Sequence, residues 1–470
     1  MILTTIERAV RGLLFAWQQL SLDAKVVGGV ATVNWLLLFA NHTTVGAERD
    51  VPLWQLFPLA DAVVFLVVTG TLAVTYPLRD RRLGPAFTPR ARAVHLAAIV
   101  AAFVIVPTVA SIILRETGRP YTYIHDGALM IEEASRKLLA GQNPYVADYL
   151  DTALYYWPML NNPALYHLTY FPMLFLVTTP FVWAFGHLGA FWDQRYLYLP
   201  AFVATLAILP LVIRGTERRL SAVALVGLNP QLFPFVVEGR NDFFVLLFLF
   251  AGIALLQRER RTLAGLAFAA GAAAKLHALF ILPFVAVYLV ATKRPRTVRE
   301  AWTVLWRPLW PAVLLLAVTF LPFLLNDWGA FYDDVVRYNA GGAAWTYPIS
   351  GMGFSALLLS VGVIAYRQAD FPFAVIEIVV AAPIAVWSLR RLWQTPTISV
   401  LLGGYGATLL AFLFFGRYFQ GNYLGYILAV ATPIPFLRSL PRRRSRAARV
   451  AARRPTVDAP ASASPLRPID

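Results

Sequence analysis

Long apolar runs separated by short basic segments recur along most of this 470-residue chain. Residues 94–114, 309–325 and 397–415 are examples of such runs. A helix of about 20 apolar residues is long enough to cross the roughly 30 Å hydrocarbon core of a bilayer. Charged residues make up only 14% of the chain, whereas they make up about 25% of an average soluble domain. The sequence therefore predicts an all-α integral membrane protein.

The basic residues are concentrated between the apolar runs and account for the formal net charge of +16. An excess of Lys and Arg is typical of short cytoplasmic loops, so this charge indicates orientation in the membrane and not binding to nucleic acid. The main basic clusters lie at residues 79–92, 214–219, 257–261, 293–307 and 438–454. Alternation of sides between them predicts about twelve transmembrane helices plus two partial segments, with both termini cytoplasmic.

This organisation divides the chain into three regions. Residues 1–92 hold an amphipathic surface helix and two spans of open role, and residues 93–438 form the transmembrane core. Residues 439–470 are a basic tail that ends rich in Pro, Ala and Ser. This composition predicts a disordered cytoplasmic segment lying on anionic lipid.

Two apolar stretches of the core break the alternation of sides. Residues 169–187 are predicted to be re-entrant or too short to span, because Pro172 and Pro180 interrupt them. Residues 352–366 have the same parity problem and follow an outer loop, residues 327–350, that is rich in aromatic residues and glycine. Whether either stretch crosses the membrane fully is left open.

A first outer loop, residues 115–168, is too polar to span, and loops of this length are usually functional. Within it Asp126 follows His125 where a helical pattern begins, and Gly141 supplies a stop. Asp126 is either the N-cap of this helix or a carboxylate at the water–lipid boundary that takes a proton from a hydroxyl, and one side chain can do both. His125 could orient that carboxylate or contact a substrate, although a single loop histidine is more often a surface residue.

Lys275 lies inside residues 262–292, an apolar run that is too long for one span and has basic segments at both ends. A hairpin that turns near Lys275 and His277 is therefore expected. Lys275 has no carboxylate near it in sequence, and a charge inside a membrane segment is costly enough to predict a function. It either extends to the outer interface or binds an anionic phosphate, to which His277 could add a donor.

The segment EGRND, residues 238–242, follows an apolar stretch, residues 221–237, that is expected to reach the outer face as one crossing. Arg240 could pair with a phosphate, and Asn241 or Asp242 could contact sugar hydroxyls. The alternative is an ordinary interfacial loop in which Asp242 caps the next helix.

Tyr170 and Arg417 lie at the ends of predicted spans and are weaker candidates for substrate binding. Tyrosine at such positions usually anchors a helix at the membrane interface. In this chain it could instead stack on the face of a sugar.

Several common motifs are missing from the sequence. It has no DxD triplet to hold a metal–nucleotide diphosphate, no phosphate-binding Walker lysine and no glycine-rich dinucleotide fingerprint. His and Glu do not occur at metal-binding spacings, and the chain has no cysteine. The sequence therefore gives no support for a metal, a cofactor or a nucleotide-sugar donor.

The remaining motifs follow one another in a defined order. An outer loop with an early Asp leads to a helix that ends LLAGQNPY, and TYFP, LNPQLFPFVVEGRND and a glycine-spaced run up to Lys275 follow. Over residues 95–430 this order resembles the C-superfamily of membrane glycosyltransferases. The closest resemblance is to glycosyltransferase family 87, which includes polyprenol-phosphate-mannose-dependent mannosyltransferases.

The resemblance implies a metal-independent cell-envelope enzyme that moves a sugar, by analogy mannose, from a polyprenyl-phosphate donor with inversion. The acceptor would be a lipid or glycan on the outer face of a bacterial cytoplasmic membrane. Asp126 would be the general base on its hydroxyl, and Lys275, Arg240 and His277 would hold the donor phosphate. The chain departs from the family pattern in that two extra spans precede the Asp-bearing loop.

Two other functions are compatible with the sequence. A transporter or flippase for a lipid-linked anion could place Lys275 in an interrupted helix, although no inverted repeat is visible. An O-antigen ligase or polymerase-like enzyme would be expected to carry its large loop late in the chain, whereas the larger loop here comes early.

Overall fold

The computed structural model describes residue 7 and residues 15–39, 59–159 and 162–437. The protein is an all-α membrane protein, as the sequence predicts. In the part of the chain that is described, the only strands are β1 (Ser350–Gly351) and β2 (Tyr418–Phe419), which pair in parallel. Part of the predicted surface helix and the predicted basic tail lie outside the described residues.

Six helices among the described residues are long and apolar enough to cross a membrane. They are Asp61–Ala86, Pro89–Thr117, Arg195–Val212, Leu276–Lys293, Val298–Asn326 and Phe373–Gln394. There are also two shorter apolar helices: α12 (Asp242–Gln257) lies between the third and fourth of these helices, and α20 (Ile398–Phe414) follows the last. The expected count of about twelve spans is therefore not confirmed.

The first helices of the chain pack together and against the core. α2 (Leu22–Phe39) packs against α4 (Leu59–Leu83) and against α10 (Thr216–Gly227). The side-chain amide of Asn34 in α2 donates to the carbonyl of Leu228, 2.7 Å away, just beyond α10. α5 (Pro89–Val100), η2 (Ala101–Ile105) and α6 (Val106–Thr117) follow as one continuous helix that leads to the first outer loop.

The stretch 221–237 is not the single crossing that the sequence suggested. α10 ends at Gly227, and α11 (Phe233–Glu238) begins only after a turn. Pro230 disfavours a helical conformation at Asn229, whose side chain instead accepts from the Gln231 amide at 3.0 Å. The helix is therefore interrupted between Gly227 and Phe233, although the apolar pattern of the sequence continues through this segment.

In α8 (Pro172–His187), by contrast, proline does not interrupt the helix. The helix begins at Pro172 and runs through Pro180 without ending, so the expected interruption is wrong. Its 16 residues nevertheless make it about 24 Å long, short for a crossing. The second irregular stretch contains only α18 (Phe354–Ser360), which at seven residues is too short to cross.

The predicted hairpin at 262–292 is confirmed. α13 (Arg261–Ala272) ends just before Lys275, whose backbone is extended, and η5 (Leu276–Phe280) leads into α14 (Ile281–Lys293). The remaining elements are η1 (Gly84–Ala86), α7 (Asp126–Leu139), η3 (Ala153–Tyr156), η4 (Pro163–Leu165), α9 (Arg195–Val212), α15 (Val298–Asn326), α16 (Trp328–Tyr332), η6 (Asp333–Arg337), α17 (Tyr338–Ala340), α19 (Phe373–Gln394), α21 (Gly421–Ala431) and η7 (Ile434–Phe436).

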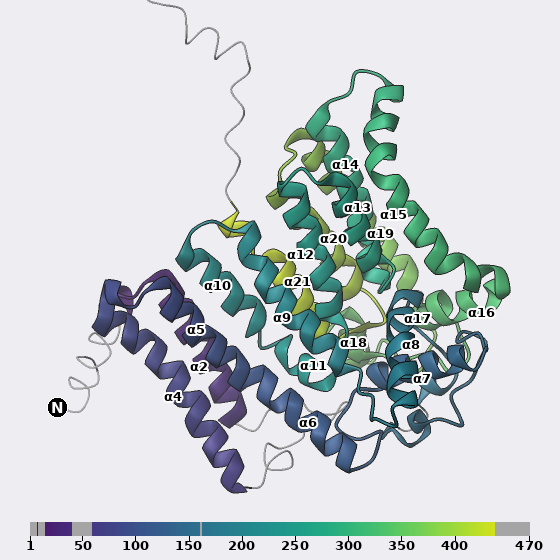
Figure 1. The fold of residues 1–470 in the computed structure, drawn as a ribbon. Coiled ribbons are helices and arrows are strands. Elements are labelled where there is room, and N and C mark those ends of the chain that lie inside the picture. Colours follow the sequence, from purple (N-terminus) through teal and green to yellow (C-terminus); the bar gives the residue numbers. More distant parts are fainter. Residues whose placement is uncertain (1–6, 8–14, 40–58, 160–161, 438–470) are drawn as a thin grey trace, which may run out of the picture. The chain divides into compact units, whose positions relative to one another are not determined.

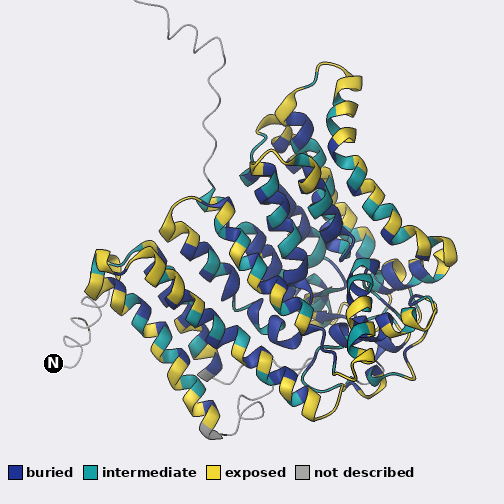
Figure 2. Ribbon diagram, in the orientation of Figure 1, coloured by how far each residue is buried: buried dark blue, intermediate teal, exposed yellow. Residues whose placement is uncertain are grey.

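α12 lies at the centre of the helix packing. It contacts α9 and α13, α13 in turn contacts α15, and α19 packs against α20 and α14 (Figure 1). Figure 2 shows α12 largely buried, whereas α15 exposes apolar side chains along its length, among them Trp310, Val318 and Leu325. An apolar exposed face of this kind is suited to lipid contact.

The two ends of α12 have different surroundings. Beyond its C-terminal end, Arg261 lines one groove with Lys293, Arg296 and other residues of the next basic loop. At its N-terminal end, Asp242 is buried against the candidate site. The 16 residues of α12 separate these ends by about 24 Å. Two of the five basic segments that were predicted to share one membrane face, at 257–261 and 293–307, therefore lie together, and the candidate site lies at the other end of the helix.

Candidate functional site

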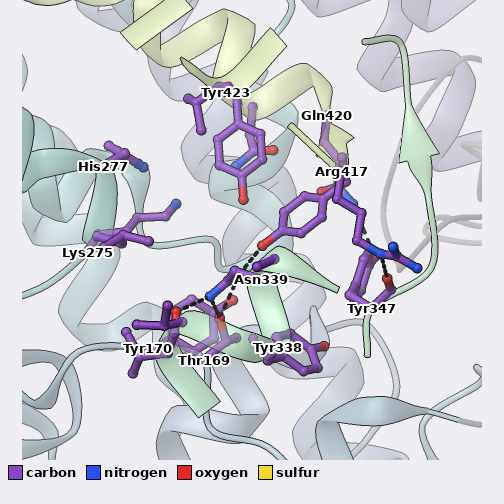
Figure 3. A pocket seen from close by; sticks show the side chains of 18 of the residues that line it. Thr169, Tyr170, Lys275, His277, Tyr338, Asn339, Tyr347, Arg417, Gln420 and Tyr423 are labelled. Carbon is purple, nitrogen blue, oxygen red and sulfur yellow. Dashed lines mark hydrogen bonds between the residues drawn. The ribbon is translucent and has the colours of Figure 1, made fainter. Parts of the chain in front are cut away.

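One cavity of about 380 Å³ collects residues from both predicted outer loops and from the ends of the membrane helices. Asp126 and Lys275, 149 residues apart in the numbering, both line it. Of the residues singled out from the sequence, the cavity wall contains His125, Asp126, Tyr170, Arg240, Asn241, Lys275, His277 and Arg417. Asp242 lies directly behind this wall, bonded to Lys275. Figure 3 shows Lys275 and His277 on one side of the pocket and Arg417 and Gln420 on the other.

Asp126 is the first residue of α7 and is not its N-cap. The cap is His125, whose Nδ1 lies 3.0 Å from the amide nitrogen of Gly127. The expected N-cap position of Asp126 is therefore wrong: the cap lies one residue earlier, and Asp126 is already the first residue of the helix. Oδ1 of Asp126 lies 2.8 Å from the same Nδ1 of His125.

Backbone contacts fix the loop that carries Asp126. The amide of His125 donates to the carbonyl of Glu238 at 2.8 Å, which ties this loop to the one that carries Arg240. The indole of Trp157 donates to the carbonyl of Ile124 at 3.0 Å. Asp126 is thus held between the first outer loop and the start of α12.

The electrostatic surroundings keep Asp126 ionised. Burial alone would raise the pKa of its carboxyl, but His125 and then Arg240 outweigh burial and hold that pKa below its ordinary value. The hydroxyl of Tyr170 lies close to Gly127, the residue after Asp126. A Cβ added to Gly127 would lie 2.0 Å from the Tyr170 Oη, so only glycine fits there. The carboxylate is therefore available as a proton acceptor at neutral pH, beside a tyrosine held close to it.

Lys275 is paired with a carboxylate that is distant in sequence. Its Nζ lies 2.8 Å from Oδ1 of Asp242, and the side-chain amide of Asn422 donates to the other carboxylate oxygen at 3.0 Å. Asp242 is the first residue of α12 and Asn241 is its N-cap, without a side-chain hydrogen bond. The suggested capping role of Asp242 is therefore also wrong, because its carboxylate is used by Lys275 and Asn422.

Arg240 continues the same polar network. It donates to Glu238 at 3.1 Å, to Gln420 at 2.6 Å and to Asn422 at 3.2 Å, and it stacks 4.3 Å over the ring of Phe235. Asn422 thus bonds both to Arg240 and to the carboxylate that holds Lys275. The start of α12, the turn before η5 and the start of α21 are joined at one wall of the cavity.

His277 retains unused hydrogen-bonding capacity. It is 4% exposed, its ring packs 4.6 Å from that of Tyr426, and it lines the cavity. Within the described part of the chain its Nε2 has no hydrogen-bond partner. A buried ring nitrogen in this state is a ready contact for a polar ligand.

Arg417 lines the cavity, but its hydrogen bonds go to the backbone. It donates to the carbonyls of Tyr347, Ala369 and Arg367 at 2.7, 3.0 and 3.2 Å. These bonds hold residues 347–369 beside the pocket. In this arrangement Arg417 shapes the cavity wall.

Several lining residues were missed from the sequence, among them Asn339, Glu377, Gln420 and Asn422. Asn339 bonds to Thr169 and to Tyr418, which links the second outer loop to the start of α8 and to β2 (Figure 3). No local pattern marks it. Glu377 also lines the cavity. A signal for it did exist, because it is the only charged residue in the apolar run 371–389.

A second buried charge cluster supports α7 from behind. We call Arg115, Glu132, Asp193 and Arg195 the closed cluster. Arg115 donates to both oxygens of Glu132 at 2.9 and 2.7 Å and to Asp193 at 2.8 Å. Arg195 donates to both oxygens of Asp193 at 2.8 Å. The cluster joins α6, α7 and the start of α9.

Comparison with known proteins adds no family to this geometry. No protein-family model matches the chain, and no curated protein matches it at a significant level. The resemblance noted from the motifs therefore stays a prediction.

Proposed function

We propose that this protein is an inverting glycosyltransferase that takes its sugar from a polyprenyl-phosphate donor. One observation carries the proposal: a single cavity in a membrane protein is lined by the Asp126 carboxylate and by Arg240, Lys275 and His277. This combination suits a reaction that removes a proton from one substrate and releases a phosphate from the other. We propose mannose as the sugar, and a lipid or glycan on the outer side of a bacterial cytoplasmic membrane as the acceptor.

The donor phosphate would lie against Lys275, Arg240 and His277. Lys275 and Arg240 supply positive charge, and the free Nε2 of His277 supplies a hydrogen bond. Fixed cations lower the barrier to a step in which a phosphate leaves with an extra negative charge. The apolar part of the same cavity, which includes Leu276 next to Lys275, offers a surface for the first units of the prenyl chain.

Asp126 would act on the acceptor. As an acceptor hydroxyl oxygen attacks the anomeric carbon, its proton passes to the Asp126 carboxylate. The bond between that carbon and the phosphate oxygen breaks, and the phosphate leaves with the electron pair. One displacement of this kind inverts the configuration at the carbon and requires neither oxidant nor metal.

Replacement of Asp126 by Asn tests the assignment. Loss of a positioned general base is expected to lower transfer from polyprenyl-phosphate mannose by at least about 100-fold in washed membranes. Asp148→Asn, an exposed carboxylate of the same loop, is the matched control and should retain wild-type turnover. Because the pKa of Asp126 is lowered, this group stays ionised as the pH falls from 8 to 5 and should not itself reduce the rate. Full activity of the Asn variant would remove Asp126 from the mechanism.

Transport of a lipid-linked anion is the second candidate. It is favoured by the break between α13 and α14 at Lys275, since transporters place substrate sites at interrupted helices. Purified protein in liposomes distinguishes the two functions. Movement of the lipid-linked sugar across the bilayer without formation of a glycosidic bond would favour transport.

A further inference from the structure

Glu377 is a carboxylate inside a helix that is otherwise suited to lipid. It lies in α19, which has the length and hydropathy of a membrane crossing. The adjacent side chains of Ile378 and Val379 are 61% and 64% exposed, as expected of a face that contacts lipid. Charged side chains in such segments are costly and usually face a partner or a cavity. Glu377 faces the cavity that holds Asp126 and Lys275.

The Glu377 carboxylate has no partner. Among the residues that the structure describes, neither a hydrogen bond nor an ion pair involves it. Asp126 and Asp242, the other carboxylates at this site, are bonded to His125 and Lys275. A partly buried carboxylate without a partner costs free energy, which a ligand that donates hydrogen bonds would recover.

The position of Glu377 indicates which ligand this is. Its Oε1 lies over the backbone of Gly416, where an added Cβ would be 2.4 Å away. Gly416 precedes Arg417, which Figure 3 places across the pocket from Lys275 and His277. A carboxyl group on that side supplies no positive charge to hold a phosphate. A carboxylate accepts hydrogen bonds, so the hydroxyls of a sugar are the chemistry that fits it.

We propose that Glu377 binds a hydroxyl of the glycosyl acceptor and thereby places that sugar opposite the donor phosphate. This inference rests on the proposed function and adds the acceptor side of the same cavity. The acceptor it describes is an uncharged, hydroxyl-rich sugar with a lipid tail, because Ala374 and Ile378 extend the cavity wall with apolar surface beside the carboxylate. Glu377 is a specificity-determining residue in this scheme, and Asp126 remains the base.

Binding measurements test this without relying on turnover. Protein in lipid nanodiscs is titrated with octyl α-mannoside as the acceptor probe and with undecaprenyl phosphate as the donor probe. Glu377→Leu should weaken binding of the mannoside at least about tenfold and leave binding of the prenyl phosphate within about twofold. Glu377→Gln should weaken mannoside binding less, because the amide oxygen still accepts a hydrogen bond.

Two further variants sharpen the test. Gly416→Ala keeps the charge of Glu377 but pushes its carboxylate aside, so it should also weaken mannoside binding. Glu300→Gln is the matched control: this carboxylate lies at the first turn of α15, lines the groove between the basic loops, and should change neither affinity. Glu377→Leu replaces an unpaired carboxylate by an apolar side chain, so its thermal unfolding midpoint should not fall.

The outcomes separate this inference from the proposed function. If Glu377→Leu binds the mannoside as well as wild type does, or if wild type does not bind it, the inference is wrong even where wild type transfers sugar from a prenyl phosphate. If affinities change as expected but wild type transfers no sugar from any prenyl phosphate, the glycoside site stands and the glycosyltransferase proposal fails.

Discussion

The protein contains two buried groups of charges that differ in how completely their members are bonded. In the closed cluster, two arginines and two carboxylates neutralise each other, and all four side chains are at most 2% exposed. Their remaining donors also have partners: Arg195 donates to the carbonyls of Tyr123 and Val237, and Arg115 to that of Pro120. The closed cluster therefore has no capacity left for a ligand.

The charges around the cavity are only partly bonded. Glu377 has no partner within the described residues, Nε2 of His277 is free, and Asp126 has only His125 as a side-chain partner. In the closed cluster these polar groups bond to each other, whereas at the cavity the unbonded groups can form hydrogen bonds with a ligand. Burial and charge occur at both places, so it is the unused bonding capacity that distinguishes a candidate site from a scaffold.

The largest effect is expected when the closed cluster is opened. Arg115→Met leaves Glu132 without its bidentate partner and should lower the free energy of unfolding by about 3–5 kcal/mol, the usual cost of an uncompensated buried charge. Thermal unfolding of purified protein in detergent measures the change. Arg119→Met, on the exposed loop just after α6, is the control and should unfold as wild type does.

A second substitution can restore the balance of that cluster. Arg115→Met combined with Glu132→Leu removes both members of one ion pair and leaves Asp193 with Arg195. The double variant should be more stable than Arg115→Met alone. Equal or lower stability would mean that the pair does not act as a unit.

A smaller effect, measured as ligand binding, is expected at the cavity. Lys275→Ala should weaken binding of undecaprenyl phosphate by about 10- to 100-fold, because a charge-assisted hydrogen bond contributes about 1.5–3 kcal/mol. Binding of octyl α-mannoside should change much less. Lys137→Ala is the control, since Lys137 pairs with the exposed Asp151 away from the cavity. Equal losses for both probes would count against a phosphate role for Lys275.

The smallest effect concerns a titratable contact between the two outer loops. His167 lies 2.7 Å from Asp334 through Nδ1 and 2.5 Å from the carbonyl of Ala344 through Nε2, so both ring nitrogens face acceptors. Burial alone would lower the pKa of His167, but the bonds to Asp334 and Ala344 raise it above 6.5. The pKa of Asp334 is also raised, in this case by burial, which disfavours the charged form of its carboxyl group.

The sign of the pH dependence follows from the shift of His167. His167 holds its proton more tightly in the folded protein, so its contact stabilises the loops fully below pH 6.5, and this contribution is lost as the pH rises through the raised pKa of His167. Amide exchange in residues 333–345 should therefore be a few-fold faster at pH 8 than at pH 6, after correction for the intrinsic rate. His167→Gln should remove the difference, and a difference that persists in this variant would assign it to another group.

Local patterns were sufficient to predict several elements. The helix that starts at residue 126 and stops before Gly141, and the hairpin that turns at Lys275, both follow from residue spacing and turn residues. The break at Pro230 could have been predicted in the same way. It was missed because the apolar pattern continues through it, and apolarity alone does not distinguish a helix from a buried turn.

The partners of the charged residues could not be predicted. Lys275 pairs with a residue 33 positions away, and Arg115 bonds to residues 17 and 78 positions away. No periodicity links positions that far apart. The capping role expected for Asp126 was wrong for a different, local reason. The helix begins one residue earlier than expected, so His125 is its cap.

The sequence by itself determined that this chain forms apolar helices joined by loops of known charge, since helix length and hydrophobicity are properties of contiguous residues. It also identified most of the charged side chains that line the cavity. Only the tertiary structure decided which of those side chains are already bonded to each other and which are free, because hydrogen bonds between distant segments depend on how the helices pack. That distinction separates the arginines that hold the fold together from the carboxylates that a ligand can still reach.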